Sequence, residues 1–92
     1  MYTINYERPA RVWLEKLAQK NPNLAAKIVK KIDWLAENAD HLDHEKMKGH
    51  AELSLHFGGY RILYLLDRLK QTVTVCFIDH HDKAYQRLRR RK

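Results

Sequence analysis

The fold is decided by residues 53–66, which read LSLHFGGYRILYLL. The first five residues alternate between apolar and polar, which is the period of a strand with one buried face. The pair Gly58-Gly59 is a hairpin turn signal. Residues 60–66 follow and are apolar on both faces except at Arg61. The stretch therefore predicts a β-hairpin whose second strand lies in the middle of a sheet.

The residues before this hairpin predict a strand and two helices. Residues 2–6 alternate as a strand does, and Pro9 opens a run of helical apolar spacing that ends near Lys20. Asn21-Pro22 combines an N-cap with a first-turn proline, and the second helix is expected to end near Asn38. So few residues separate the two helices that they should form an antiparallel hairpin.

The remaining segments complete a single α+β domain over residues 1–92. Residues 39–50 have no sustained period and are expected to form a loop, and residues 72–78 alternate as a further strand. Asp82 is expected to be the N-cap of a short C-terminal helix. The last three strands then form an antiparallel meander in one sheet with the N-terminal strand, and the helical hairpin covers one face. The core is expected to include the large aromatic residues Tyr6, Trp13 and Trp34.

Charge is distributed unevenly along the chain. Residues 1–45 hold seven basic and seven acidic residues, whereas residues 46–92 hold eleven basic and four acidic ones, so the net charge of +7 lies in the second half. Such a field attracts polyanions, and nucleic acid is the obvious candidate. The alternative is a solvated basic surface that binds nothing.

Composition also limits the environment of the protein. The single cysteine, Cys76, excludes an intramolecular disulfide and fits a reducing cytoplasm. No apolar run approaches the ~20 residues that a membrane span needs, and the first residues lack the pattern of a signal peptide. We therefore expect a cytoplasmic protein without a membrane partner.

Arg61 is the first candidate for chemistry. A charged side chain within a central strand is costly unless its face is open to water or holds an anion. A guanidinium matches the geometry of a phosphate. The alternative is an ion pair between Arg61 and Glu52 of the neighbouring strand.

The other candidates lie in the loop and near the C-terminus. His80 and His81 could move protons near neutral pH, but adjacent side chains in an extended segment point in opposite directions, so one at most faces a given site. Tyr85 could stack on a base, or it could only pack the last helix. Lys46 and Lys48 could contact phosphates or be solvated. The histidines and Cys76 lack the spacing of metal ligands, so we expect no metal or cofactor.

Two motifs resemble a known superfamily. The segment Gly59-Tyr60-Arg61-Ile62-Leu63-Tyr64 is similar to the G-Y-R-h-h-Y signature of the RelE/ParE toxins, where h is apolar. The ending from Phe77 to Tyr85 resembles the strand followed by G-H-R-x-x-x-Y in that superfamily. The resemblance covers nearly the whole chain. It implies a RelE-like, microbial-RNase-type fold and a bacterial toxin of a type II toxin–antitoxin pair.

The resemblance implies roles for particular residues. RelE members cut mRNA in the ribosomal A site, and the arginine of their G-Y-R strand, here Arg61, faces the scissile phosphate. A residue just after the last strand assists it, which would be His81, or His80 if the register differs by one. The tyrosine of the final helix maps to Tyr85. Basic loop residues map loosely to Lys46 and Lys48.

This sequence departs from the RelE pattern in two places. RelE uses catalytic lysines in the segment that leads into G-Y-R, and residues 52–56 here contain none. A histidine, His81, replaces the arginine of G-H-R. Both departures suggest a variant in which a glutamate or histidine takes the proton, as in other nuclease branches.

The expected mechanism is metal-independent attack by the RNA 2′-hydroxyl on the adjacent phosphorus. His81 or Glu52 transfers the proton, Arg61 stabilises the phosphoryl charge, and Tyr85 orients the site. The expected RNA-binding residues share a basic or imidazole side chain: Lys46, Lys48, His56, Lys83, Arg87, Arg89 and Arg90.

Two other functions remain open. A ParE-type protein would inhibit DNA gyrase without nuclease activity, and a degenerate toxin would act only in antitoxin binding and operon autoregulation. The expected partners are a cognate acidic antitoxin, mRNA and the ribosome, with operator DNA bound only through the antitoxin complex.

Overall fold

The structure is a computed structural model that describes residues 1–90, without the side chains of Tyr85 and residues 87–90. The elements in chain order are β1 (Thr3–Tyr6), α1 (Arg8–Lys20), α2 (Pro22–Asn38), β2 (Glu45–Lys46), β3 (Leu53–Phe57), β4 (Tyr60–Asp67), β5 (Thr72–His80) and α3 (His81–Arg90).

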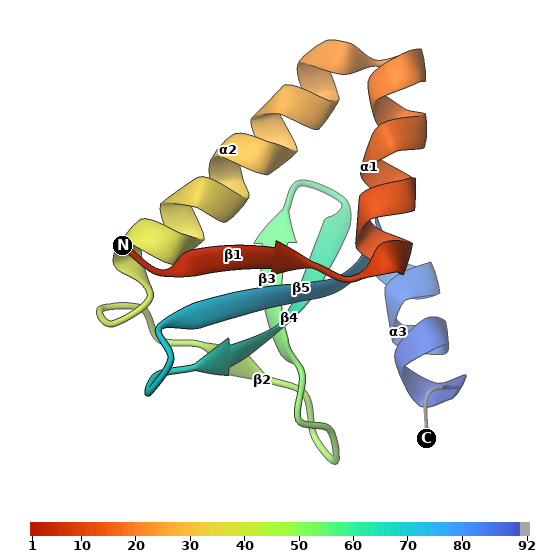
Figure 1. Ribbon diagram of the computed structural model, residues 1–92. Helices are drawn as coiled ribbons and strands as arrows, with labels where there is room; N and C mark the ends of the chain where they lie inside the picture. Colours follow the sequence, from red (N-terminus) through yellow and green to blue (C-terminus); the bar gives the residue numbers. More distant parts are fainter. Residues whose placement is uncertain (91–92) are drawn as a thin grey trace.

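The five strands form one sheet in the order β1-β5-β4-β3-β2. β1 runs parallel to β5, and the pairs β5–β4, β4–β3 and β3–β2 are antiparallel. The hairpin of α1 and α2 covers one face, and α3 lies at the other side of the sheet (Figure 1). The predicted α+β fold, with its N-terminal strand, helical hairpin, meander and C-terminal helix, is confirmed.

The predicted β-hairpin around Gly58-Gly59 is present. Phe57 pairs with Tyr60, which leaves the two glycines as a two-residue turn. Gly58 has a φ of 58°, and a positive φ at the first central residue is what a type II′ turn requires. The turn therefore sets the register of β3 against β4, and with it the neighbours of Arg61.

Two predictions about segment ends were wrong. Residues 39–50 are not entirely loop, because Glu45 pairs with Ser54 and Lys46 with Leu53 to form β2. A strand of two residues has no period that a sequence could reveal. α3 begins at His81, so Asp82 lies within its first turn and is not its N-cap.

The main core lies between the helical hairpin and the sheet. Ile28, Ile32 and Leu35 of α2 are fully buried against a sheet face that includes Ile62 and Val75. A smaller apolar cluster on the opposite face consists of Leu63, Cys76, Phe77 and Ala84 and joins α3 to the sheet. The sheet is thus covered by apolar contacts on both faces, and polar groups on it need a specific reason.

The placement of the large aromatic residues was partly wrong. Tyr6 and Trp13 pack against the main core, as predicted. Trp34 does not belong to the core, because 39% of it is exposed and Nζ of Lys31 lies 3.8 Å from the centroid of its ring. Trp34 lies outside the apolar stripe of α2, which is why it remains at the surface.

A partly buried chain of hydrogen bonds anchors the segment that follows α2. Nε2 of His44 lies 2.7 Å from the carbonyl oxygen of Ala39 and must donate to it. Nδ1 of the same ring makes a hydrogen bond with the hydroxyl of Tyr64. Burial, with a smaller contribution from the charge of Glu45, raises the pKa of Tyr64 to about 12.

We predict that Tyr64→Phe flattens the alkaline loss of stability. The unfolded chain releases this proton near pH ~10, whereas the folded protein keeps it until the pKa of about 12. The free energy of unfolding of the wild type should therefore fall as the pH rises from ~10 toward 12. At pH 7 the variant should lose about 1 kcal/mol with its hydrogen bond.

Urea unfolding at pH 7, 9 and 11 tests this prediction. The contribution of the other tyrosines is common to both proteins and cancels in the comparison. An equal fall in the wild type and in Tyr64→Phe would contradict the prediction.

Candidate functional site

Arg61 lies on the sheet face that α3 partly covers. Strand alternation places it on the same face as Leu63, which packs against Ala84 of α3. Its flanking residue Ile62 instead contacts the main core under α1 and α2. The guanidinium is therefore not beneath the helical hairpin.

The contacts of Arg61 are short and polar. Nη1 donates to Oε2 of Glu45 at 3.0 Å and to Oγ of Ser54 at 2.9 Å. Only 7% of the arginine side chain is exposed, against 50% of the Glu45 side chain. A guanidinium withdrawn from water is tolerated when an anion and hydrogen-bond acceptors meet it, and β2 supplies that anion.

Glu45 contacts two basic side chains, those of Arg61 and His56. The same Oε2 atom that accepts from Arg61 lies 3.2 Å from Nε2 of His56, whose side chain is well exposed. His56 and Arg61 are cross-strand partners, as are Glu45 and Ser54. We call Glu45, Ser54, His56 and Arg61 the Glu45 cluster. It combines a carboxylate, an imidazole and a guanidinium at one edge of the sheet.

This geometry corrects two expectations about Arg61. Its face was expected to be open to water or to an external anion, but the residue is buried and its anion is a carboxylate of the protein. The alternative of an ion pair named Glu52 as the partner, whereas the carboxylate at 3.0 Å is that of Glu45. Glu45 was missed because residues 39–50 were assigned to a loop, and only the pairing of β2 reveals it.

His80 and His81 occupy different environments, but not through strand alternation, because β5 ends at His80 and α3 begins at His81. The ring of His80 stacks on Tyr60 with centroids 4.6 Å apart, and Trp13 packs edge-on against Tyr60. This places His80 near α1. His81 begins α3, where its N–H donates to the carbonyl oxygen of Gly59 and its Nδ1 lies 3.1 Å from Asp82. Of the two, His81 belongs to the helix on the face of Arg61.

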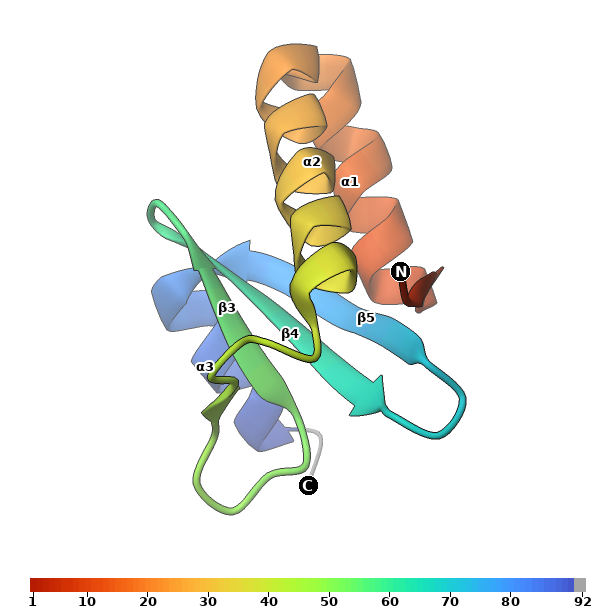
Figure 2. The same cartoon turned by 90° about the vertical axis from the view of Figure 1, so that its left-hand side faces the viewer.

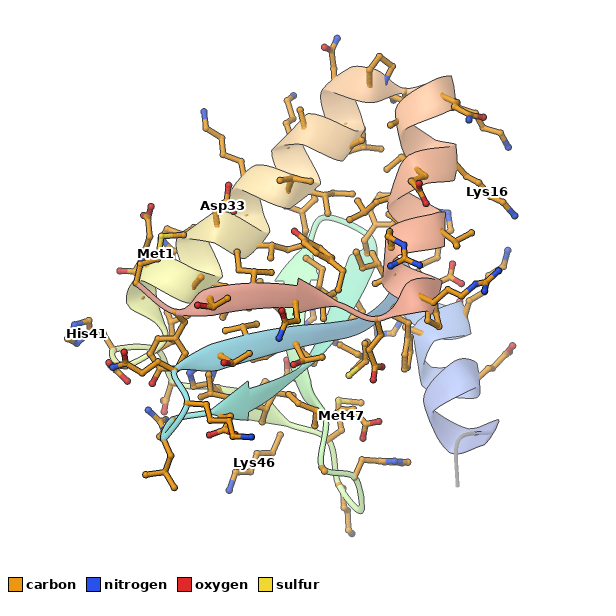
Figure 3. The ribbon with its side chains drawn as sticks, viewed as in Figure 1. Met1, Lys16, Asp33, His41, Lys46 and Met47 are labelled. Carbon is orange, nitrogen blue, oxygen red and sulfur yellow. The ribbon has the colours of Figure 1, made fainter. Side chains whose placement is uncertain are left out.

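The remaining predicted residues are only partly described. Lys46 is exposed on β2 and projects from that edge of the molecule, away from α1 and α2 (Figure 3). Lys48 and Lys83 are also exposed. Glu52 is partly buried and directly precedes β3. The side chains of Tyr85, Arg87, Arg89 and Arg90 lie outside the described residues.

Two further features concern the described part of the chain alone. Within it, no group of three or more His, Cys, Asp or Glu side chains is arranged to hold a metal ion. None of the helices described is long and apolar enough to cross a membrane.

The fold and the position of the arginine define a toxin of the RelE/ParE superfamily, and the comparison with family models supports this. Residues 4–85 match the ParE toxin of type II toxin–antitoxin systems, parDE. The match covers most of the chain, so the chain belongs to the ParE toxin family. The resemblance seen in the two sequence motifs is thereby confirmed.

Solved structures show the same fold. A chain of the RelBE2 toxin–antitoxin complex from Mycobacterium tuberculosis is 26% identical, with a TM-score of 0.70 over 87% of this chain and 91% of that one. The isolated RelE toxin of E. coli is 19% identical, with a TM-score of 0.70 over 95% and 98%. A chain of the YoeB–YefM complex from Staphylococcus aureus is 16% identical, with a TM-score of 0.70 over 88% and 98%. No curated protein sequence matches significantly.

We predict that Glu45 and Arg61 are strongly coupled in stability. Glu45→Ala should lower the free energy of unfolding by about 1–3 kcal/mol, because it removes the carboxylate from a buried guanidinium. The loss should be much smaller in an Arg61→Met background, where no buried charge remains.

The pair of Asp40 and Arg68 provides a matched control. Its charged atoms are 3.4 Å apart, but both side chains are more than half exposed. A double-mutant cycle by urea unfolding should give a coupling below about 1 kcal/mol for that pair. Equal coupling in the two cycles would show that the burial of Arg61 does not strengthen its interaction.

Proposed function

We propose that this toxin is a metal-independent endoribonuclease that cleaves mRNA and blocks translation, with the Glu45 cluster at its active site. The observation that carries the proposal is the Oε2 atom of Glu45, which lies 3.0 Å from Arg61 and 3.2 Å from His56. A half-exposed carboxylate held by a buried cation is positioned to accept a proton from a substrate hydroxyl.

The proposed reaction is an internal transfer. Glu45 accepts the proton of the 2′-hydroxyl, whose oxygen attacks the adjacent phosphorus. His81 gives a proton to the departing 5′-oxygen, which leaves a 2′,3′-cyclic phosphate and a 5′-hydroxyl. Arg61 holds Glu45 in place, and its guanidinium stabilises the charge that develops on the phosphoryl oxygens. His56 is the second candidate for the proton acceptor.

Glu45 replaces Glu52 in this proposal for a geometric reason. A general base and the group that stabilises phosphoryl charge must act on the same phosphate, so they must be close together. Glu45 contacts Arg61 directly. Glu52 remains a third candidate for the proton acceptor, because it precedes β3 by one residue. Tyr85 would orient the site, as the superfamily implies, and His80 is less suited because its ring stacks on Tyr60.

The RNA backbone would lie along the basic half of the chain. Lys46, Lys48 and Lys83 are exposed, and the remaining expected contacts are Arg87, Arg89 and Arg90. Several such contacts give a salt-dependent affinity without sequence preference. Two of the relatives named above are seen in toxin–antitoxin complexes, RelBE2 and YoeB–YefM. We infer an acidic antitoxin here too, action on ribosomes in the cytoplasm, and contact with operator DNA only through the antitoxin complex.

Gyrase inhibition is the second candidate function. Two observations favour it: the matching family model is that of ParE, and an arginine bonded to a carboxylate and a serine can serve structure alone. In that case the Glu45 cluster would only stabilise the sheet.

We predict that Glu45→Gln lowers the cleavage rate of mRNA on stalled ribosomes by about 10²–10⁴-fold, because it removes the proton acceptor without changing its size. Glu52→Gln is the matched control and should cleave at nearly the wild-type rate. Circular dichroism and urea unfolding must show that both variants are folded. If Glu45→Gln cleaves at the wild-type rate and Glu52→Gln does not, the proton acceptor is Glu52 and not Glu45.

A pulse of expression in cells separates the candidate functions. The nuclease should produce new mRNA 5′-ends within minutes, without a DNA-damage response, and Arg61→Ala should abolish both the ends and the growth arrest. A damage response with intact mRNA would instead identify a gyrase inhibitor. Unchanged growth without antitoxin would identify a degenerate toxin.

A further inference from the structure

One side of α2 carries a basic and aromatic surface that the proposed reaction does not use. Lys27, Lys30, Lys31 and Trp34 follow the i, i+3, i+4, i+7 spacing that places residues on one side of a helix. Together with Phe57 at the end of β3 they line a depression of about 360 Å³. Trp34 is 39% exposed, so part of a large aromatic side chain is accessible on this side of the helix.

This depression continues toward the Glu45 cluster. A second depression of about 340 Å³ shares Lys31 and Trp34 with the first, and its lining also includes Glu45, Ser54 and His56. We call the two together the α2–β3 groove. In Figure 2, α2 descends toward the sheet and leads into the segment that carries β2. The groove therefore connects an exposed tryptophan to the proposed active site.

We propose that the α2–β3 groove binds the single-stranded RNA next to the scissile phosphate, with one base stacked on Trp34 and the backbone phosphates on Lys27, Lys30 and Lys31. This inference rests on the proposed function, since it assigns a path to the substrate of that site. Nζ of Lys31 lies 3.8 Å from the centroid of the indole ring, and 39% of Trp34 stays exposed. A cation beside a partly exposed aromatic ring suits a base that stacks next to its own phosphate.

The chemistry of the groove favours RNA over an acidic antitoxin peptide. A peptide helix docks through apolar side chains at i, i+3, i+4 and i+7, and it needs a continuous apolar groove. Here the exposed upper part offers two aromatic residues among three lysines. Proteins commonly bind single-stranded nucleic acid with aromatic side chains beside cationic ones, because every base has a face that can stack on an aromatic ring.

The test uses a 2′-O-methyl RNA 12-mer, which cannot be cleaved by attack of a 2′-hydroxyl. In a Trp13→Phe background Trp34 is the only tryptophan, and its fluorescence should be quenched as the RNA saturates the protein. Trp34→Ala should weaken binding by about tenfold, in line with the loss of one stacked base. Trp34→Phe should restore most of the affinity.

Salt dependence tests the lysines. Lys27→Gln/Lys30→Gln/Lys31→Gln should reduce the slope of log K against log salt by about 2, because each single-strand phosphate that a lysine no longer neutralises lowers the slope by about 0.7. The control Lys16→Gln/Lys20→Gln/Lys70→Gln removes the same charge from α1 and the β4–β5 turn. It should leave the slope unchanged, although Lys16 and Lys20 line a separate depression with Trp13 and His80.

Three results would overturn the inference. These are unchanged Trp34 fluorescence at saturating RNA, an equal loss of slope in the control variant, and quenching by an acidic peptide but not by RNA. The last result would assign the groove to the antitoxin.

Failure of the proposed function has a different signature. If unmodified mRNA is not cleaved but RNA quenches the fluorescence of Trp34, RNA binding in the α2–β3 groove is supported and the proposed nuclease activity is contradicted. If mRNA is cleaved while RNA leaves the fluorescence of Trp34 unchanged, the proposed nuclease activity is supported and RNA binding in the α2–β3 groove is contradicted.

Discussion

A guanidinium inside a β-sheet must meet an anion, and the arrangement of this toxin's outer strands follows from that requirement. Arg61 is almost fully buried, so its charge would be costly without the carboxylate of Glu45 and the hydroxyl of Ser54. The two residue pairs of β2 and β3 bring both groups to it. The shortest strand of the sheet is therefore the one that places the carboxylate of the site.

Local patterns predicted the parts of this protein that local physics controls. Alternation predicted β1, β3 and β5, and a run apolar on both faces predicted β4. Helical spacing predicted α1 and α2, and Gly58-Gly59 predicted the turn that aligns β3 with β4. The pairing of Glu45 with Ser54 could not be predicted, since it depends on where a loop returns to an edge strand and not on any period. Trp34 was misplaced because hydrophobicity alone suggested the core, although its position on α2 lies off the apolar stripe.

The sequence identified Arg61, the central residue of the candidate site, but not its partner Glu45. The motif around Gly59-Tyr60-Arg61 identified the arginine, whereas His80 and His81 are separated because β5 ends at His80 and α3 begins at His81. The carboxylate was sought on β3, at Glu52, whereas the contact belongs to Glu45. In the function that we propose, Arg61 therefore acts together with a neighbouring carboxylate at the edge of the sheet, next to a groove that leads to Trp34.

The central claim is that the Glu45 cluster contacts a phosphate of the RNA backbone. A crystal structure of the protein bound to 2′-O-methyl RNA tests it directly. We expect a backbone phosphate within hydrogen-bond distance of the Arg61 guanidinium, with the modified 2′-oxygen facing Glu45. RNA bound elsewhere, with Arg61 and Glu45 still paired to each other and no phosphate beside them, would show that the cluster only stabilises the sheet.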